Sequence, residues 1–307
     1  MSAHRRFGRR VALASCAAVL TGLGVQASAQ PRPPANAPAS PKAGAPIDLT
    51  GYWVSVVSED WRHRMATARK GDYESLPLNA NGRRTADAWN LDADSAAGAQ
   101  CKAFGVGGLI RQPGRLHVTW ADDDTLRVDF DAGTQTRLLE FASTAQPSGE
   151  KTWQGFSRAQ WLRPPQAGGG PARAQIGNNT GPIAPGGGGR GQRGGPELSP
   201  ALAEGGSLKV VTTNFRAGYL RKNGVPYSES ASITEYYHRL PDAPNGDVYL
   251  DVVTIVEDPE YLNEPLYTST MFKREANGAK WSPTPCRTAP PPAGPQAAAR
   301  PAEPLPR

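Results

Sequence analysis

A dense run of charged side chains follows the first apolar segment of the chain, in the order Glu59-Asp60-Trp61-Arg62-His63-Arg64. Two carboxylates and a histidine within five positions can donate and accept protons, and the neighbouring arginines can hold an anionic group. Glu59, Asp60 and His63 are therefore the candidate catalytic residues of a hydrolase or isomerase. The same run also fits a solvated loop that leaves the first strand, and this alternative stays open.

A second set of candidate residues lies near position 235. In an extended strand every second side chain points to the same face, so Glu235, Tyr237 and Arg239 share one face. If that face is buried, the acid and the base each need a partner. Glu235 and Arg239 are too far apart to pair along one strand, and Arg137 and Arg221 are the available partners from elsewhere. The alternative is a solvent-facing surface.

The segment from Trp153 to Trp161 alternates in the same way. One of its faces carries small residues between the two tryptophans, which is typical of a strand that leaves room for something large. A concavity with aromatic walls and a few polar groups is typical of a small-molecule site. We therefore expect a small, partly apolar ligand, bound by Trp153, Trp161, Tyr219, Arg221, Tyr227, Glu235, Tyr237, Arg239 and Arg137.

Several other chemistries lack their signatures. No two of His63, His117 and His238 have the spacing of metal ligands, so we predict no metal site. The chain has no Gly-x-Ser-x-Gly elbow, no phosphate-binding loop and no dinucleotide fingerprint, so we predict no cofactor. A glycosidase with paired carboxylates stays open, because such pairs follow no spacing rule.

The first 29 residues have the composition of an export signal. Four arginines and no acid precede an apolar run from Val11 to Val25, and the small-x-small sequence Ala27-Ser28-Ala29 follows. The run is short for a membrane-spanning helix, although an uncleaved anchor is the alternative. Two arginine pairs leave the twin-arginine and general export routes equally open. Cys16 lies in a partial lipobox, so lipidation there is a further alternative.

Cleavage after Ala29 changes the charge of the chain. The formal net charge of +6 falls to +2 once the four arginines of the leader are removed. The predicted linkers hold more than this remaining excess, so the folded part is mildly acidic. The sequence therefore predicts a periplasmic or secreted protein with no nucleic-acid partner and no membrane span, and it leaves the oligomeric state undetermined.

Cleavage also leaves two cysteines, Cys101 and Cys286. In an oxidising compartment a pair of cysteines favours a disulfide. The bond would tie the early part of the domain to its C-terminal end, and two free thiols are the alternative.

Pro-, Ala- and Gly-rich stretches divide the mature chain. Residues 30–47, 163–206 and 289–307 are predicted to be a disordered linker, insertion and tail, because they cannot bury apolar surface. The remaining parts of 48–288 suffice for a single domain with one core.

Alternating apolar patterns dominate that domain. Short segments with period-2 alternation recur from Tyr52 to Arg274, and turn sequences such as Asn223-Gly224 separate sequential neighbours. We predict an all-β fold, an antiparallel meander that closes as a lipocalin-like barrel or a strongly curved sheet. One helix is expected, capped by Asn79 and running through Ala88 and Trp89.

A series of motifs resembles a widespread uncharacterised family of exported bacterial proteins. It begins with Asp48-Leu49-Thr50-Gly51-Tyr52-Trp53 and continues with Trp153-Gln154-Gly155-Phe156-Ser157, Thr234-Glu235-Tyr236-Tyr237-His238-Arg239 and Asp258-Pro259. Members of that family often carry histidine where this chain has Phe156. The resemblance implies export and a β-rich fold, but no established activity. Gly51-x-Trp53 also resembles the start of lipocalin-like barrels, in which a tryptophan closes the base under an arginine.

Three hypotheses about function remain: a binding protein, an enzyme and an interaction module. The leading hypothesis is an exported small-molecule-binding barrel without catalytic activity. The second is a periplasmic hydrolase or isomerase that uses Glu59, Asp60 or His63. The third is an interaction module of the cell envelope, with the insertion 163–206 as its contact.

Overall fold

A computed structural model describes residues 40–142, 144–147, 149–163 and 205–290. The predicted leader over residues 1–29, most of the predicted insertion and nearly all of the predicted tail lie outside these described residues. Among the described residues, no helix is long and apolar enough to span a membrane.

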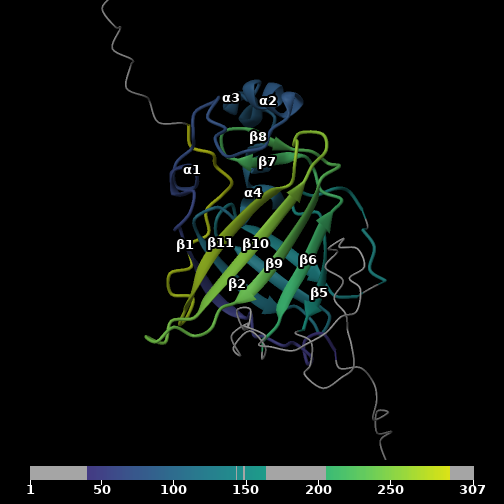
Figure 1. The fold of residues 1–307 in the computed structure, drawn as a ribbon, viewed down its shortest axis with the longest axis vertical. Helices are drawn as coiled ribbons and strands as arrows, with labels where there is room; N and C mark the ends of the chain where they lie inside the picture. Colours follow the sequence, from purple (N-terminus) through teal and green to yellow (C-terminus); the bar gives the residue numbers. More distant parts are fainter. Residues whose placement is uncertain (1–39, 143, 148, 164–204, 291–307) are drawn as a thin grey trace, which may run out of the picture. The chain divides into compact units, whose positions relative to one another are not determined.

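Nine strands form a closed barrel in the order β1-β11-β10-β9-β6-β5-β4-β3-β2 (Figure 1). The prediction of an all-β barrel is confirmed. The strands are β1 (Gly51–Val56), β2 (Arg115–Trp120), β3 (Thr125–Phe130), β4 (Gln135–Glu140), β5 (Phe156–Leu162), β6 (Ser207–Thr213), β9 (Ser232–Arg239), β10 (Tyr249–Glu257) and β11 (Leu266–Glu275).

The meander is antiparallel except at one place. β4 and β5 pair in parallel, at Leu139 with Ser157 and at Glu140 with Arg158. Between β6 and β9 the chain forms a separate hairpin of β7 (Gly218–Arg221) and β8 (Val225–Tyr227). Its turn contains Asn223 and Gly224, and Gly224 has a φ of +82° that favours glycine. The predicted hairpin turn is therefore present.

The helices are more numerous than expected. α2 (Ala80–Asp87) begins as predicted, because the side chain of Asn79 accepts a hydrogen bond from the Gly82 amide at 2.9 Å. The expectation of a single helix is wrong, since the structure adds α1 (Trp61–Met65), α3 (Leu91–Ala96), α4 (Val106–Leu109) and the 3₁₀-helix η1 (Gln100–Phe104). Each has only four to six residues, too few for a helical period to be visible in sequence.

These helices and the β7–β8 hairpin lie at one end of the barrel, which we call the capped end (Figure 1). An apolar cluster that includes Leu76, Leu220, Tyr227 and Val256 packs between the hairpin, the loop before α2 and the barrel strands. A second cluster, which includes Trp53 and Phe272, fills the inside of the barrel. The chain thus has two adjoining cores, one inside the barrel and one beneath its cap.

Trp53 is fully buried in the barrel core. Its indole nitrogen donates to the carbonyl of Leu49 at 2.9 Å, and the Arg274 guanidinium lies 5.7 Å from the ring centroid. A tryptophan beneath an arginine is what the lipocalin resemblance implies. The barrel has nine strands, however, where lipocalins have eight, so lipocalin-like character stays a prediction.

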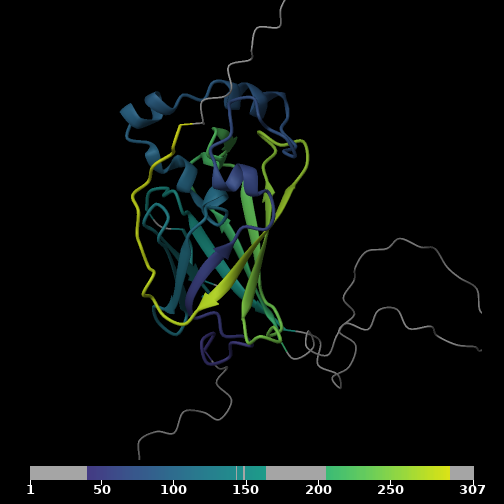
Figure 2. The same cartoon turned by 90° about the vertical axis from the view of Figure 1, so that its left-hand side faces the viewer.

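Cys101 and Cys286 form the predicted disulfide. The chain after β11 runs back along the outside of the barrel toward the capped end (Figure 2). There Cys286 joins it to η1, across 185 positions of sequence. Closing a loop of this length restricts the unfolded chain, which stabilises the fold by roughly 5 kcal/mol on a chain-entropy model.

The last part of the predicted N-terminal linker contacts the barrel. The indole nitrogen of Trp161 donates to the carbonyl of Pro41 at 2.8 Å, and Ile47 packs against the barrel core. Residues 40–47 therefore belong to the folded unit, although their composition predicts a disordered linker.

Candidate functional site

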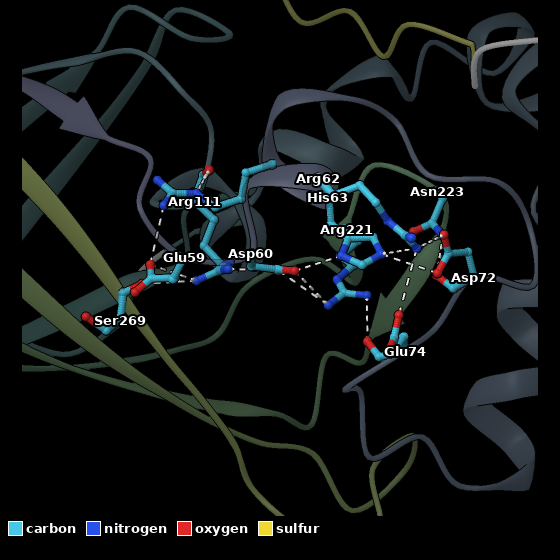
Figure 3. A network of polar contacts seen from close by, with 11 residues as sticks. Glu59, Asp60, Arg62, His63, Asp72, Glu74, Arg111, Arg221, Asn223 and Ser269 are labelled. Carbon is cyan, nitrogen blue, oxygen red and sulfur yellow. Dashed lines mark hydrogen bonds and ion pairs between the residues drawn. The ribbon is translucent and has the colours of Figure 1, made fainter.

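Asp60 lies at the centre of a network of ion pairs at the capped end (Figure 3). Its carboxylate is 2.7 Å from His63 Nδ1, 2.9 Å from an Arg111 nitrogen and 3.3 Å from an Arg221 nitrogen. These partners come from α1, from the segment after α4 and from β7. The candidate catalytic run of the sequence is therefore joined to two arginines that lie 51 and 161 positions further along.

The local fold around Asp60 is strained. Asp60 is the N-cap residue of α1 with a φ of +48°, in the left-handed region that only a few per cent of non-glycine residues adopt. Its carbonyl accepts the amides of His63 and Arg64, both at 3.1 Å, while its side chain is turned toward His63 Nδ1. Such a conformation costs on the order of 1–3 kcal/mol and tends to occur at functional sites.

His63 lies between two carboxylates. Its Nδ1 faces Asp60 at 2.7 Å and its Nε2 faces Asp72 at 3.3 Å, and only 8% of its side chain is exposed. With both ring nitrogens engaged, His63 can fix the orientation of Asp60 but has no nitrogen left for a ligand. The structure thus places His63 behind the site, as a positioning residue.

The β7–β8 turn supports this network through Asn223. The Asn223 side-chain nitrogen donates to the carbonyls of Arg69 and Asp72, at 3.0 and 3.1 Å. These bonds hold the loop that carries the Asp72 carboxylate, which also accepts a hydrogen bond of 2.6 Å from Arg62. A turn that the sequence predicts only as local structure thereby orients the site.

Arg111 and Arg221 are nearly buried, with 11% and 9% of their side chains exposed. Arg221 also donates to the carbonyl of Glu74 at 2.9 Å, and Arg111 to the carbonyl of Ser269 at 3.2 Å. Arg111 reaches this place because α4 packs tightly on β7. A Cβ at Gly108 would lie 2.5 Å from the Tyr219 carbonyl, closer than real contacts allow.

Burial and charge act differently on the two acids of the site. Burial would raise the pKa of Asp60, but the hydrogen bond from His63 and the charges of Arg221 and Arg111 outweigh it and lower that pKa. Burial dominates at Glu59, so the pKa of Glu59 is raised in spite of Arg111 and Arg64. The site thus holds one carboxylate fixed in the charged form and one that protonates more readily.

The cations of the site are also affected by burial. Burial lowers the pKa of Arg221 and of Lys222. Burial together with the nearby charge of Arg111 lowers the pKa of Arg64 to about 10. Packing several cations into one buried cluster is unfavourable unless acids compensate them, and Glu59 and Asp60 do so for the three arginines.

A pocket of about 370 Å³ opens beside this network, and we call it the edge pocket. One wall is charged and the other is largely apolar, with a tyrosine at the rim. Its lining residues are Glu59, Asp60, Ser75, Leu76, Gly107, Arg111, Leu220, Arg221, Val256, Leu266, Tyr267, Thr268 and Ser269. Ser75, like Asp60, has a positive φ, of +63°.

The edge pocket exists because β1 and β11 separate. They pair from Tyr52 with Glu275 as far as Val56 with Met271. Beyond that point β1 turns away toward Glu59 and α1, whereas β11 continues to pair with β10 back to Leu266. The barrel wall is therefore open on one side of residues 266–270, and the pocket fills this opening.

The predicted pair of Glu235 and Arg137 lies elsewhere, inside the barrel. The two side chains form a bidentate ion pair, with nitrogen–oxygen distances of 2.5 and 2.9 Å, and are 0% and 1% exposed. Arg137 also donates to the hydroxyls of Thr212 and Ser157. It therefore occupies the room that the small residues of β5 leave, and Tyr237 is buried on the same inner face of β9.

Two other predicted ligand residues line a second pocket. Tyr219 and Tyr227, together with Trp89, border a space of about 320 Å³ under the cap. The Tyr219 hydroxyl donates to Asp94 at 2.7 Å, and Tyr227 is buried against Phe215. Of the predicted ligand residues, only Arg221 lines the edge pocket.

The remaining predicted ligand residues are dispersed. Trp153 lies just before β5 with the Arg216 guanidinium 4.2 Å from its ring centroid. Trp161, near the end of β5, packs on Phe141, and Arg239 pairs with Asp242 at the surface. The structure does not bring the predicted aromatic residues together around a single ligand.

Most of the residues that line the edge pocket carry no signal in the sequence. Arg111 lies in a Gly-rich segment without periodicity, and Ser75 and Ser269 carry no motif. Tyr267 is part of an expected strand, but the opening beside it depends on where β1 turns away, which no local pattern reveals. Glu59 and Asp60 are the only predicted catalytic residues that line this pocket.

Within the described ranges, no group of three or more His, Cys, Asp or Glu side chains is arranged to hold a metal ion. Comparison of the chain with protein-family models, with curated proteins and with solved structures finds no match. The function must therefore be argued from the site itself.

Proposed function

We propose that this protein is an exported barrel that binds a small molecule in the edge pocket. The observation that carries the proposal is the contact of Asp60 with Arg111 and Arg221 at the floor of an open pocket. Side chains from three distant parts of the sequence converge there. The export half of the proposal rests on the predicted leader, and the Cys101–Cys286 disulfide is compatible with it.

The energetics of the network favour a functional role. Removing two arginines from water costs several kcal/mol per ion, and well-packed apolar residues at such places are often as stable or more stable. The left-handed backbone of Asp60 and of Ser75 adds a further cost at the same pocket. Stability alone gives no reason to keep this arrangement, whereas recognition of a polar ligand does.

The two walls of the pocket indicate the ligand. Leu76, Leu220, Val256 and Leu266 offer an apolar surface, so part of the ligand is apolar. Glu59 can donate or accept a proton, and the two arginines are cationic hydrogen-bond donors. These groups suit a carbonyl, hydroxyl or carboxylate group of the ligand. The volume lies within the range of small-molecule sites.

The proposal is tested by native mass spectrometry of the full chain, purified from the periplasm of the bacterium that makes it. We expect a non-covalent mass that is released on unfolding. Arg221→Met should lower the occupancy at least about tenfold, because one charged hydrogen-bonding group is lost. Arg127→Met, on the outer face of β3, is the matched control and should retain the ligand. A bare wild-type chain contradicts the proposal.

A second candidate function uses the same pocket for acid–base catalysis. Glu59 has a raised pKa, lines the pocket, and lies 3.8 Å from an Arg111 nitrogen that can stabilise developing negative charge. A hydrolase or isomerase reaction that transfers a proton through Glu59 would fit this geometry. Glu59→Gln separates the two functions. Ligand retention with loss of turnover favours the enzyme, and unchanged conversion of the ligand excludes Glu59 as a catalyst.

A further inference from the structure

The strand edge inside the edge pocket has unused backbone hydrogen-bonding groups. In the β1–β2 pairing, the Ser55 amide donates to the carbonyl of Gly114, so the backbone of Ser55 faces β2. Its neighbours Val54 and Val56 therefore face β11, where their partners are Lys273 and Met271. The odd-numbered residues of β11 thus direct their amides and carbonyls toward β1.

The same alternation continues beyond the point where β1 turns away. Tyr267 and Ser269 must direct their backbone groups into the opening, because their even-numbered neighbours bond to β10. The hydrogen bond from Arg111 to the Ser269 carbonyl confirms this direction. No strand among the described residues pairs with Tyr267 or Ser269 on this side. The amides of both residues and the Tyr267 carbonyl therefore border the pocket.

The side chains around the pocket agree with an exposed edge. The pocket is lined by Tyr267 and Ser269, which point outward from the barrel, and by Leu266 and Thr268, which point inward. Only a strand edge presents both faces to one space. Tyr267 is 65% exposed at the rim, so the edge is accessible.

We propose that the ligand of the edge pocket is a short peptide that binds in an extended conformation along Tyr267–Ser269. This inference rests on the proposed function and names its ligand class. Addition of a strand to a free sheet edge is a common mode of peptide recognition, in which the main chain gives affinity and alternate side chains enter pockets. The open edge from Leu266 to Thr270 spans about 14 Å, which suits a tripeptide.

The charged wall fits the ends of such a peptide. Arg221 and Arg111 lie where a terminal carboxylate can bind, and Glu59 can accept a hydrogen bond from an amide or ammonium group. The apolar wall of Leu76 and Leu220 suits one side chain of the peptide. The opening is closed at one end, where Val56 of β1 pairs with Met271, so a longer peptide could leave it only past Tyr267. We therefore expect free short peptides rather than internal protein segments.

The first test compares two sets of peptides by isothermal titration calorimetry with the full chain. The probes are tripeptides of Ala, Val and Leu with free termini, and the same tripeptides with both backbone amides N-methylated. We expect a subset of the first set to bind and N-methylation to weaken binding about tenfold, because the Tyr267 carbonyl then loses the one hydrogen bond that it can accept from the peptide. Equal binding of the methylated set overturns the inference.

The second test changes the strand edge itself. Tyr267→Pro removes an amide that faces the opening and no hydrogen bond to β10, which an edge strand tolerates. It should weaken tripeptide binding about tenfold. Tyr267→Ala, which removes the same side chain but keeps the amide, is the matched control and should bind more tightly than Tyr267→Pro. Equal binding by the proline variant contradicts the inference. If that variant does not fold, amide exchange of Tyr267 and Ser269 in the wild type decides, because a bound peptide must slow both.

The outcomes separate the two proposals. If no tripeptide binds, but a co-purified non-peptide mass is lost in Arg221→Met, the edge pocket is a ligand site and the peptide inference is wrong. If no tripeptide binds and the chain also carries no co-purified mass, both proposals fail.

Discussion

The Arg111 guanidinium donates to the backbone carbonyl of Ser269 at 3.2 Å, at a place where β1 no longer pairs with β11. A side chain thus replaces one hydrogen bond of a missing strand. The same guanidinium holds Asp60 at 2.9 Å. The opening in the barrel and the charged network are therefore parts of one arrangement, and Arg111 connects them.

Replacement of Arg111 should destabilise the fold. Arg111→Met leaves the carboxylate of Asp60 with one arginine and the Ser269 carbonyl without its donor. We expect a loss of about 2–4 kcal/mol in the free energy of unfolding, measured by urea denaturation. Arg127→Met, at an exposed pair, should change it by less than about 0.5 kcal/mol. Equal stability of the two variants would show that the Arg111 contacts are not maintained in solution.

The ion pair inside the barrel should behave as a structural element. Glu235→Leu leaves Arg137 as an uncompensated buried charge. It should lower the free energy of unfolding by about 3–5 kcal/mol. The double variant Arg137→Met/Glu235→Leu should recover most of this loss, because both charges are then absent. Urea denaturation measures the stability of the three proteins. The double variant should keep the ligand that we propose for the edge pocket. Loss of that ligand in the double variant would indicate that the binding site lies inside the barrel.

Asp60 should contribute to stability in a way that is lost in acid. Its pKa is lowered on folding, so the folded state favours the ionised form. The contribution is complete above the ordinary pKa of 3.8 and disappears as the pH falls through the lowered value. Asp60→Asn should therefore lose stability less steeply than the wild type below about pH 4. Urea denaturation at several pH values measures this difference. If the free energy of unfolding falls equally steeply in acid for Asp60→Asn and the wild type, this expectation is wrong.

Glu59 should show the opposite dependence. Burial raises its pKa, so its protonated form is favoured by folding, and this contribution is lost as the pH rises through the raised value. Glu59→Gln should therefore gain stability relative to the wild type as the pH rises above about 4.3. Glu150→Gln, at an exposed position away from the site, is the control. A constant difference between Glu59→Gln and the wild type from pH 4 to 7 would mean that Glu59 is not buried as described.

Loss of the disulfide should weaken the attachment of the C-terminal segment. Cys101→Ser/Cys286→Ser removes the cross-link that closes a loop of 185 positions. We expect the free energy of unfolding to fall by up to roughly 5 kcal/mol. The midpoint of urea denaturation should fall, and a reducing agent should shift the wild type toward the double variant. A wild type that is insensitive to reduction would indicate that the bond contributes little.

Much of the barrel could be predicted from the sequence because its signals are local. Alternation marks the strands, Asn223-Gly224 marks a hairpin, and the Asn79 side chain caps α2. The pairing of Cys101 with Cys286 follows from there being no other cysteine after the predicted leader. Each of these predictions needs only near neighbours or a count.

The site could be predicted only in part because it depends on long-range geometry. Glu59 and Asp60 stand out in a dense charged run, but their partner Arg111 has no pattern of its own. Glu235 and Tyr237 do share an inner face, and Arg137 does pair with Glu235, yet the pair packs the barrel core. The sequence does not distinguish a face that binds a ligand from a face that packs against another side chain.

The most direct test of the central proposal is a crystal structure of the protein purified from the cells that produce it, with the small molecule that we propose it binds. We predict ligand density in the edge pocket, in contact with Arg221 and Glu59 and beside Tyr267. Density inside the barrel at Arg137 and Glu235, or in the pocket beside Tyr219 and Tyr227 with the edge pocket empty, would contradict the account.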